Sequence, residues 1–235
     1  MYTSLSRTFS QQYGLLLLLI LADYIAMSVV GDHPAGRILV QLLLGATLLL
    51  TILITHARRI WFNFALLGSA VCVLAALVGF AFVQQTSRSE GVVNALGVCI
   101  VLLATFAILR DVANHKVVSA QSVLGASCIY LLVGVGFALL FSSVGAFTPG
   151  GFFIGQSTAN VSDYLFFSFT TLTTVGYGNL VPAAPLGQSL AMVEALSGQI
   201  YLVLVVARLV SLWGQEMPPR HRRERPDSEQ QPPTN

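Results

Sequence analysis

Six apolar segments separated by short polar joints run along the chain. Each is long enough for a helix that crosses a bilayer, because about 20 helical residues span a hydrocarbon core of about 30 Å. The joints between the first four segments suit only neighbouring antiparallel helices, which predicts a four-helix bundle. The segments are Gly14 to Val30, Arg37 to His56, Phe62 to Val83, Gly91 to Leu109, Gln121 to Val144 and Gln188 to Trp213.

A further apolar segment, Ser162 to Leu172, is only half as long, about 16 Å at 1.5 Å per residue. Its large apolar residues recur at helical spacing, and Ser162 as N-cap with Asp163 in the first turn predicts where the helix starts. A half-helix at membrane depth is tolerated only where it is buried in protein or lines a water-filled cavity. We therefore expect a re-entrant helix whose C-terminal carbonyl groups favour a cation near the bilayer centre.

Composition agrees with a membrane protein. Hydrophobic residues make up 55% of the 235 residues and charged residues 9%, against roughly 25% charged in soluble domains. Lys and Arg collect on the cytoplasmic side of membranes, which predicts a multi-pass protein of the cell membrane with both termini in the cytoplasm. In six-span topology one side holds Arg7, Arg58, Arg59, Arg110, Lys116, Arg220, Arg222, Arg223 and Arg225, and the other holds Arg37 and Arg88.

Several classes of function find no support in the sequence. The net charge of +2 follows from topology and gives no continuous basic surface for nucleic acid. Cys72, Cys99 and Cys128 stand alone in separate apolar segments, without the spacing of a metal site or a disulfide. No Walker-type loop or acid pair is present, so we expect neither an enzyme nor an organic cofactor. Arg7 with the apolar run that follows also fits a cleaved signal sequence, which leaves the later topology unchanged.

The stretch SFTTLTTVGYGNLVP, and within it Thr174 to Gly178, resembles the pore loop of the potassium channel superfamily. The resemblance covers about Gln121 to Trp213 and implies K⁺ bound by the carbonyl groups of Thr174, Val175, Gly176 and Tyr177, with the Thr174 hydroxyl as a further ligand. It also implies a homotetramer. Thr173 and Asn179 flank this loop and support it.

The residue types of the loop suit this role mechanically. A dehydrated cation needs rings of oxygen atoms, and Gly176 and Gly178 give the backbone the φ freedom that turns every carbonyl group to one axis. Val175 and Tyr177 then point away from the ion and brace the loop. One chain carries one such loop, so a closed ring requires several copies, most simply four.

Three features depart from the family pattern. Asn179 stands where many relatives have Asp, and Phe166 and Phe167 stand where several have Trp. The third departure is the fourth segment, which contains no Lys or Arg, so voltage gating does not follow from the resemblance. The first four segments resemble the sensor-like domain of six-span channels by number and position only.

The last apolar segment supplies the candidate inner helix. Gly198 lies near mid-membrane, where it serves either as a hinge or as a packing position. Glu194, one turn earlier, is expected to be buried behind the pore helix, hydrogen-bonded or neutral, and to support the filter. Arg208 is expected to snorkel to headgroups. The predicted pore-lining face, able to gate by dewetting, consists of Gln199, Leu202, Val206 and Val210.

Other positions keep more than one interpretation. Asp23 either has a structural partner or senses protons. Asp111 to Ser119, with His115, is either a surface helix or a solvated connector. The tail is expected to be disordered and carries Arg220, Arg222, Arg223 and Arg225. These arginines either bind anionic lipid or only keep the tail on the cytoplasmic side.

Together these observations predict an all-α membrane protein with six transmembrane helices plus a re-entrant pore helix and filter loop, assembling as a tetramer. Its parts are a cytoplasmic N-terminus (1–12), a four-helix sensor-like domain (13–110), a linker (111–119), a pore domain (120–213) and a tail (214–235). The expected function is passive, potassium-selective conduction. Alternatives are a less selective cation channel and a non-conducting regulatory subunit of a partner channel.

Conduction by this chain is expected to depend weakly or not at all on voltage. A sensor needs several Arg residues in the fourth segment, because one charge moved across the field yields only about 2.3 kcal/mol per 100 mV. Gly91 to Leu109 contains no Lys or Arg, and Arg110 stands alone at its end. A conductance–voltage curve in planar bilayers is the measurement, and an effective gating charge of several units would contradict the expectation.

Overall fold

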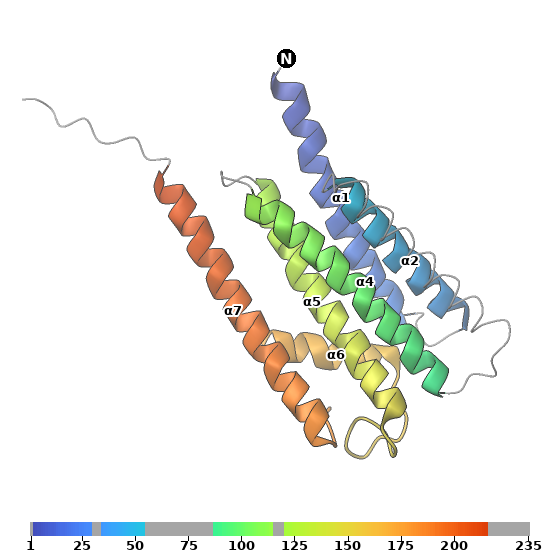
Figure 1. The fold of residues 1–235 in the computed structure, drawn as a ribbon. Coiled ribbons are helices and arrows are strands. Elements are labelled where there is room, and N and C mark those ends of the chain that lie inside the picture. The colour runs from blue at the N-terminus through green and yellow to red at the C-terminus, as the bar shows by residue number, and fades with distance from the viewer. Residues whose placement is uncertain (1, 30–33, 55–86, 115–119, 216–235) are drawn as a thin grey trace, which may run out of the picture.

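The computed structural model of the chain describes residues 2–29, 34–54, 87–114 and 120–215, and these ranges contain helices and loops but no strand. The third predicted segment, His115 and the four arginines of the tail lie outside the described residues. The helices are α1 (Tyr2–Val29), α2 (Pro34–Ile54), α4 (Ser87–Asn114), α5 (Ala120–Phe147), α6 (Val161–Leu172) and α7 (Pro185–Gln215) (Figure 1).

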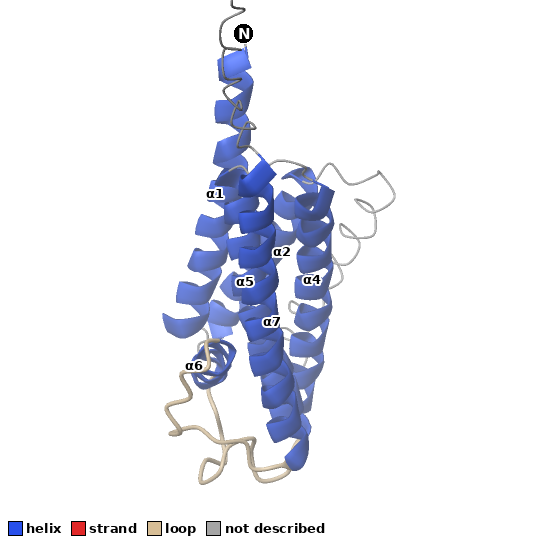
Figure 2. Ribbon diagram, turned by 90° about the vertical axis from the view of Figure 1, so that its left-hand side faces the viewer, coloured by secondary structure: helices blue, strands red, loops and turns tan. Residues whose placement is uncertain are grey.

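Five long helices run roughly alongside one another, and the short α6 lies across them (Figures 1 and 2). α5 is the centre of this arrangement, since it packs on α1, α4, α6 and α7. α1 and α4 therefore both pack on α5 of the same chain, and α1 also contacts α6. Among the described residues, three helices are long and apolar enough to cross a membrane, namely Gly91–Val112, Ser122–Phe147 and Pro185–Arg208, and shorter apolar helices cover Tyr13–Val29 and Leu42–Thr51. The described residues thus form a helical membrane protein.

Several helix ends differ from those predicted. α1 begins at Tyr2, within the stretch expected to precede the first span, and α4 continues to Asn114, into the expected linker. α7 begins at Pro185 instead of Gln188. Proline suits the first helical position because its missing N–H would have no partner there. Apolar runs locate a membrane-spanning stretch, but helices continue past it wherever their backbone groups are satisfied.

Polar side chains join α4 to α5 within an otherwise apolar contact. The buried hydroxyl of Ser143 donates to the carbonyl oxygen of Gly91 at 2.9 Å, and Asn94 donates to the hydroxyl of Ser142 at 2.9 Å. Gly91 has no side chain at the point where Ala146 and Phe147 approach most closely. Small residues and such interhelical hydrogen bonds hold helices together in membranes, where burial of apolar surface adds little.

Two charged residues of the long helices have polar partners. Asp23 in α1 is buried and accepts a hydrogen bond from the hydroxyl of Thr47 in α2 at 2.8 Å, as expected of a carboxyl group inside a helical bundle. Arg208 near the end of α7 donates to the carbonyl oxygen of Val112 at 3.1 Å. The last carbonyl groups of α4 lack helical partners and can accept from this cation. The side chain of Arg208 is exposed and keeps further N–H donors, so its contact with lipid headgroups stays a prediction.

We expect Ser143→Ala to destabilise the purified protein and Ser127→Ala to leave it nearly unchanged. The first substitution removes a bond between two helices, worth about 0.6 to 2 kcal/mol. The second removes a bond within α5, because the Ser127 hydroxyl donates to the carbonyl oxygen of Val123. Thermal unfolding in detergent measures both, and equal melting temperatures for the two variants would contradict the expectation.

Candidate functional site

The short helix α6 begins one residue earlier than predicted. Its N-cap is Asn160 and not Ser162, and the carboxylate of Asp163 accepts from the backbone amide of Asn160 at 2.9 Å. The same carboxylate accepts from the side chain of Gln156 at 2.9 Å. Asp163 thus satisfies the orphan amide at the helix start and also fixes the loop that leads into it.

Aromatic rings hold α6 against α5 and the outer loop (residues 148–159). Phe167 lies with its ring centroid 5.0 Å from that of Phe141 in α5 and 5.3 Å from that of Phe153. Phe153 and Phe152 pack edge to face at 4.9 Å, and both contact Tyr164. Such ring pairs add about 0.5 to 1.5 kcal/mol each beyond burial. This cluster fixes the start of the helix.

The outer loop also pairs with the chain that follows the filter. The backbone amide of Ile154 donates to Val181 and that of Ala183 donates to Phe152, both at 2.9 Å. Gln188 at the start of α7 donates to the carbonyl oxygen of Pro182 at 3.1 Å. Both ends of the predicted filter (residues 173–179, called the filter loop below) are therefore attached to neighbouring structure by hydrogen bonds.

The filter loop turns its amide groups back to α6. The amides of Val175 and Gly176 donate to the carbonyl oxygen of Thr170 at 2.8 and 3.1 Å. A trans peptide holds its N–H and C=O groups in opposite directions. The carbonyl groups of Thr174 and Val175 therefore point away from α6, both to the same side.

Backbone angles continue this arrangement along the loop. φ is positive at Thr174 (59°), Gly176 (51°) and Gly178 (80°), whereas Val175 and Tyr177 are not in this region. Alternation between left- and right-handed residues aligns successive N–H groups on one side, and hence the carbonyl groups on the other. Glycine takes these angles without penalty, while Thr174 is strained by about 1–2 kcal/mol.

The inner end of the loop faces the middle of α7. The side-chain amide of Gln199 lies 3.5 Å from the hydroxyl of Thr174, which itself donates to the carbonyl oxygen of Thr173 at 2.7 Å. The other predicted pore-lining residues continue from Gln199 toward the end of α7 and are all exposed in the single chain: Leu202, Val206 and Val210. α7 thus carries a polar group at the loop and apolar groups beyond it.

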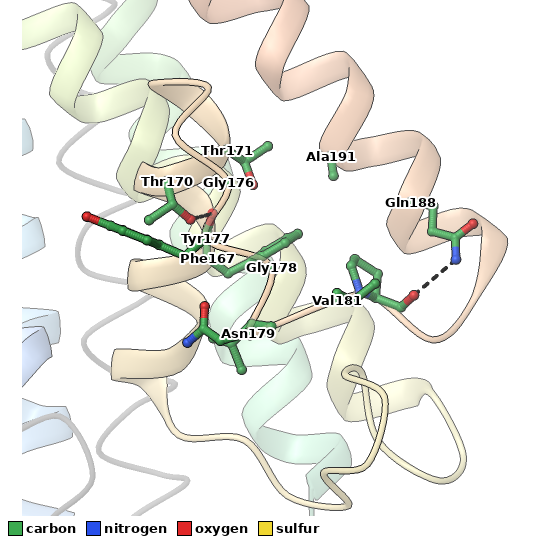
Figure 3. A pocket seen from close by; sticks show the side chains of 12 residues that line it. Phe167, Thr170, Thr171, Gly176, Tyr177, Gly178, Asn179, Val181, Gln188 and Ala191 are labelled. Carbon is green, nitrogen blue, oxygen red and sulfur yellow. Dashed lines mark hydrogen bonds between the residues drawn. The ribbon is translucent and has the colours of Figure 1, made fainter.

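The side chains of the loop leave open surface in a single chain. Tyr177 stacks on Phe166 of α6 with ring centroids 5.6 Å apart, yet 71% of Tyr177 is exposed, as is 55% of Val175. Asn179 is exposed and, with Gln188 and Ala191 of α7, lines a hollow of about 270 Å³ (Figure 3). Tyr177 therefore contacts α6 through ring stacking and leaves most of its own surface open.

Behind the loop, Glu194 of α7 contacts α6. Its side chain is fully buried, and its Oε1 lies 2.5 Å from the hydroxyl oxygen of Ser168, which is also buried. The same hydroxyl lies 2.7 Å from the carbonyl oxygen of Gly134 in α5. The expected burial of Glu194 behind the pore helix is observed, while its role in supporting the filter stays a prediction.

α7 contacts the end of α6 at Gly198. A Cβ atom built on Gly198 would lie 2.6 Å from the backbone oxygen of Leu172, the last residue of α6, and 2.8 Å from its side chain. Tyr130 of α5 donates to the same backbone oxygen at 3.3 Å. Of the two interpretations of Gly198, the structure favours packing, with α7 against the end of α6.

Three residues of the site were not singled out from the sequence: Thr170, Ser168 and Tyr130. Thr170 acts through its backbone carbonyl oxygen, and the amino-acid sequence does not indicate which backbone oxygen atoms accept such bonds. Ser168 and Tyr130 are polar residues on apolar helices, and that contrast was the available signal, although the partners follow only from the fold.

One comparison with known proteins concerns the same region. Residues 130–214 match a family model described as an ion channel. Over 83 residues the chain is 34% identical to the inward rectifier potassium channel Kirbac3.1 of Paramagnetospirillum magnetotacticum. These findings support an ion channel. They point away from an enzyme and agree with the apolar helices of a membrane protein. The second match covers 34% of this chain and 25% of the relative, so it concerns only a part of either protein.

We expect Gly198→Ala to destabilise the protein although alanine is the better helix former. The gain in helix propensity is about 1 kcal/mol, whereas forcing a Cβ against a backbone oxygen costs about 1–3 kcal/mol. Gly14→Ala in α1 is the matched control, because nothing lies within 4 Å of its Cβ position. The melting temperature of the control is expected to rise or stay level. A higher melting temperature for Gly198→Ala than for the wild type would contradict the contact.

Proposed function

We propose that four copies of this chain form a potassium-selective channel in which the filter loops surround a common axis. The observation that carries the proposal is the shared acceptor at Thr170, which turns the carbonyl groups of Thr174 and Val175 to one side. The positive φ angles at Gly176 and Gly178 favour the same direction for the next groups. Potassium ions would pass between the rings of carbonyl oxygens, with the Thr174 hydroxyl at the inner end.

Exposed surface supports assembly. Only 11% of the apolar stretch Pro185–Arg208 of α7 is buried within one chain, against 56% of the stretch Ser122–Phe147 of α5. Tyr177 and Val175 of the filter loop are exposed as well. Copies arranged by a cyclic axis would cover both surfaces, and a single loop cannot close a ring around an ion.

The remaining features follow from this arrangement. Gln199 would line the cavity below the filter, and Leu202, Val206 and Val210 would narrow it toward the cytoplasm, where apolar rings close a pore by dewetting. The termini would be cytoplasmic and the outer loop external. The arginines of the tail would lie where anionic lipids gather.

The test is ion flux into liposomes that contain only the purified chain, after native mass measurement has established the number of copies. Potassium flux that excludes sodium supports the proposal. Equal fluxes of the two ions would favour a less selective cation channel, and no flux would favour a regulatory subunit of another channel. Either of these results overturns the proposal.

We expect Gly178→Ala to lower the preference for potassium by at least about tenfold, because strain of about 1–2 kcal/mol falls on each of four loops. Gly150→Ala is the matched control. Both glycines have positive φ, 80° and 87°, and neither has an atom within 4 Å of its Cβ position, but Gly150 lies in the outer loop. Relative potassium and sodium fluxes measure the effect, and equal losses in both variants would count against the filter.

A further inference from the structure

Glu194 is an acidic group in a place that suits an uncharged one. The side chain of Glu194 is completely enclosed by protein, because its solvent-exposed fraction is 0%. Among the described residues its only hydrogen-bond contact is Ser168, and its Oε2 has no partner. An ionised carboxylate is costly in such surroundings unless a cation or several donors satisfy it.

The hydrogen bonds of the Ser168 hydroxyl group indicate the protonation state of Glu194. The hydroxyl group carries one proton and can donate only once. Its oxygen lies 2.7 Å from the carbonyl oxygen of Gly134 and 2.5 Å from Oε1 of Glu194. A carbonyl oxygen and a carboxylate oxygen are both acceptors. If both short contacts are hydrogen bonds, the second proton belongs to Glu194.

We propose that Glu194 is a neutral carboxylic acid that donates to Ser168, which in turn donates to Gly134. This chain of two bonds joins α7, α6 and α5 directly behind the filter loop. It makes Glu194 a positioning residue, because Ser168 precedes by two residues the Thr170 carbonyl that holds the filter amides. The inference rests on the proposed function for its effect on conduction, but not for the protonation itself.

The surroundings leave few other sources of charge. From α5, the phenol of Tyr130 donates to the backbone oxygen of Leu172. From α6, the neighbouring polar group is Ser168 itself. Loss of the Glu194 proton would therefore place an uncompensated charge between the helices and would remove the donor that holds them.

Infrared spectroscopy of the purified, full-length protein tests the protonation without any measurement of conduction. The wild type minus Glu194→Gln difference spectrum is expected to show the C=O stretch of a protonated carboxylic acid at neutral pH. Asp23→Asn is the control, since it removes another buried carboxyl group and should leave the Glu194 band in place. Ser168→Ala should shift that band, because it removes the acceptor. A carboxylate band in place of the acid band would overturn the proposal.

Flux measurements test the positioning role. Glu194→Gln retains a neutral donor and should keep selective potassium flux. Glu194→Met has similar size but no donor and should lose selective flux by roughly tenfold, the equivalent of one buried hydrogen bond. Equal flux in the Gln and Met variants would overturn the role. An acid band without any flux would overturn the proposed function alone, and selective flux without the acid band would overturn this inference alone.

Discussion

The arrangement of the site depends on one backbone oxygen, the carbonyl of Thr170. A helix leaves its last carbonyl groups without partners inside the helix. In α6 this one accepts the amides of Val175 and Gly176. These two hydrogen bonds rotate the peptide units of the filter loop. The rotation requires positive φ angles at Thr174 and Gly176. The strain at Thr174 thus has a function, since it sets the direction of the carbonyl groups.

The position of a filter that is attached to the end of a helix depends on how firmly that helix is held. α6 is fixed at its start by the aromatic cluster around Phe167 and at its middle by Ser168 between Gly134 and Glu194. At its end the absence of a side chain at Gly198 lets α7 approach Leu172. Small or polar residues on α5 and α7 therefore do what large apolar residues cannot, because they bring backbones close and add directional bonds.

The sequence predicted the elements of the site better than their contacts. The half-length of α6 and the glycines of the loop are local properties, so their interpretation needed no fold. The start of α6 was misplaced by the choice of Ser162, because Asn160 and Asp163 act as a pair across one turn. The bond from Arg208 to Val112 could not be predicted locally either, because the two residues lie on different helices. The choice between hinge and packing at Gly198 likewise depended on a neighbour that hydrophobic periodicity does not reveal.

The contacts of α7 differ along its length, and this difference bears on how a pore could open. Around Glu194 and Gly198 the helix meets α6 closely. Beyond them, among the described residues, Tyr201 donates to Ala126 at 2.7 Å and Arg208 donates to Val112, while the apolar side chains at Leu202, Val206 and Val210 are exposed. Local opening requires least free energy where few buried contacts are lost. In the proposed channel the C-terminal half of α7 can therefore move with less loss of contact than the half around Glu194 and Gly198. Its attachment to α4 through Arg208 places such movement under the influence of α4.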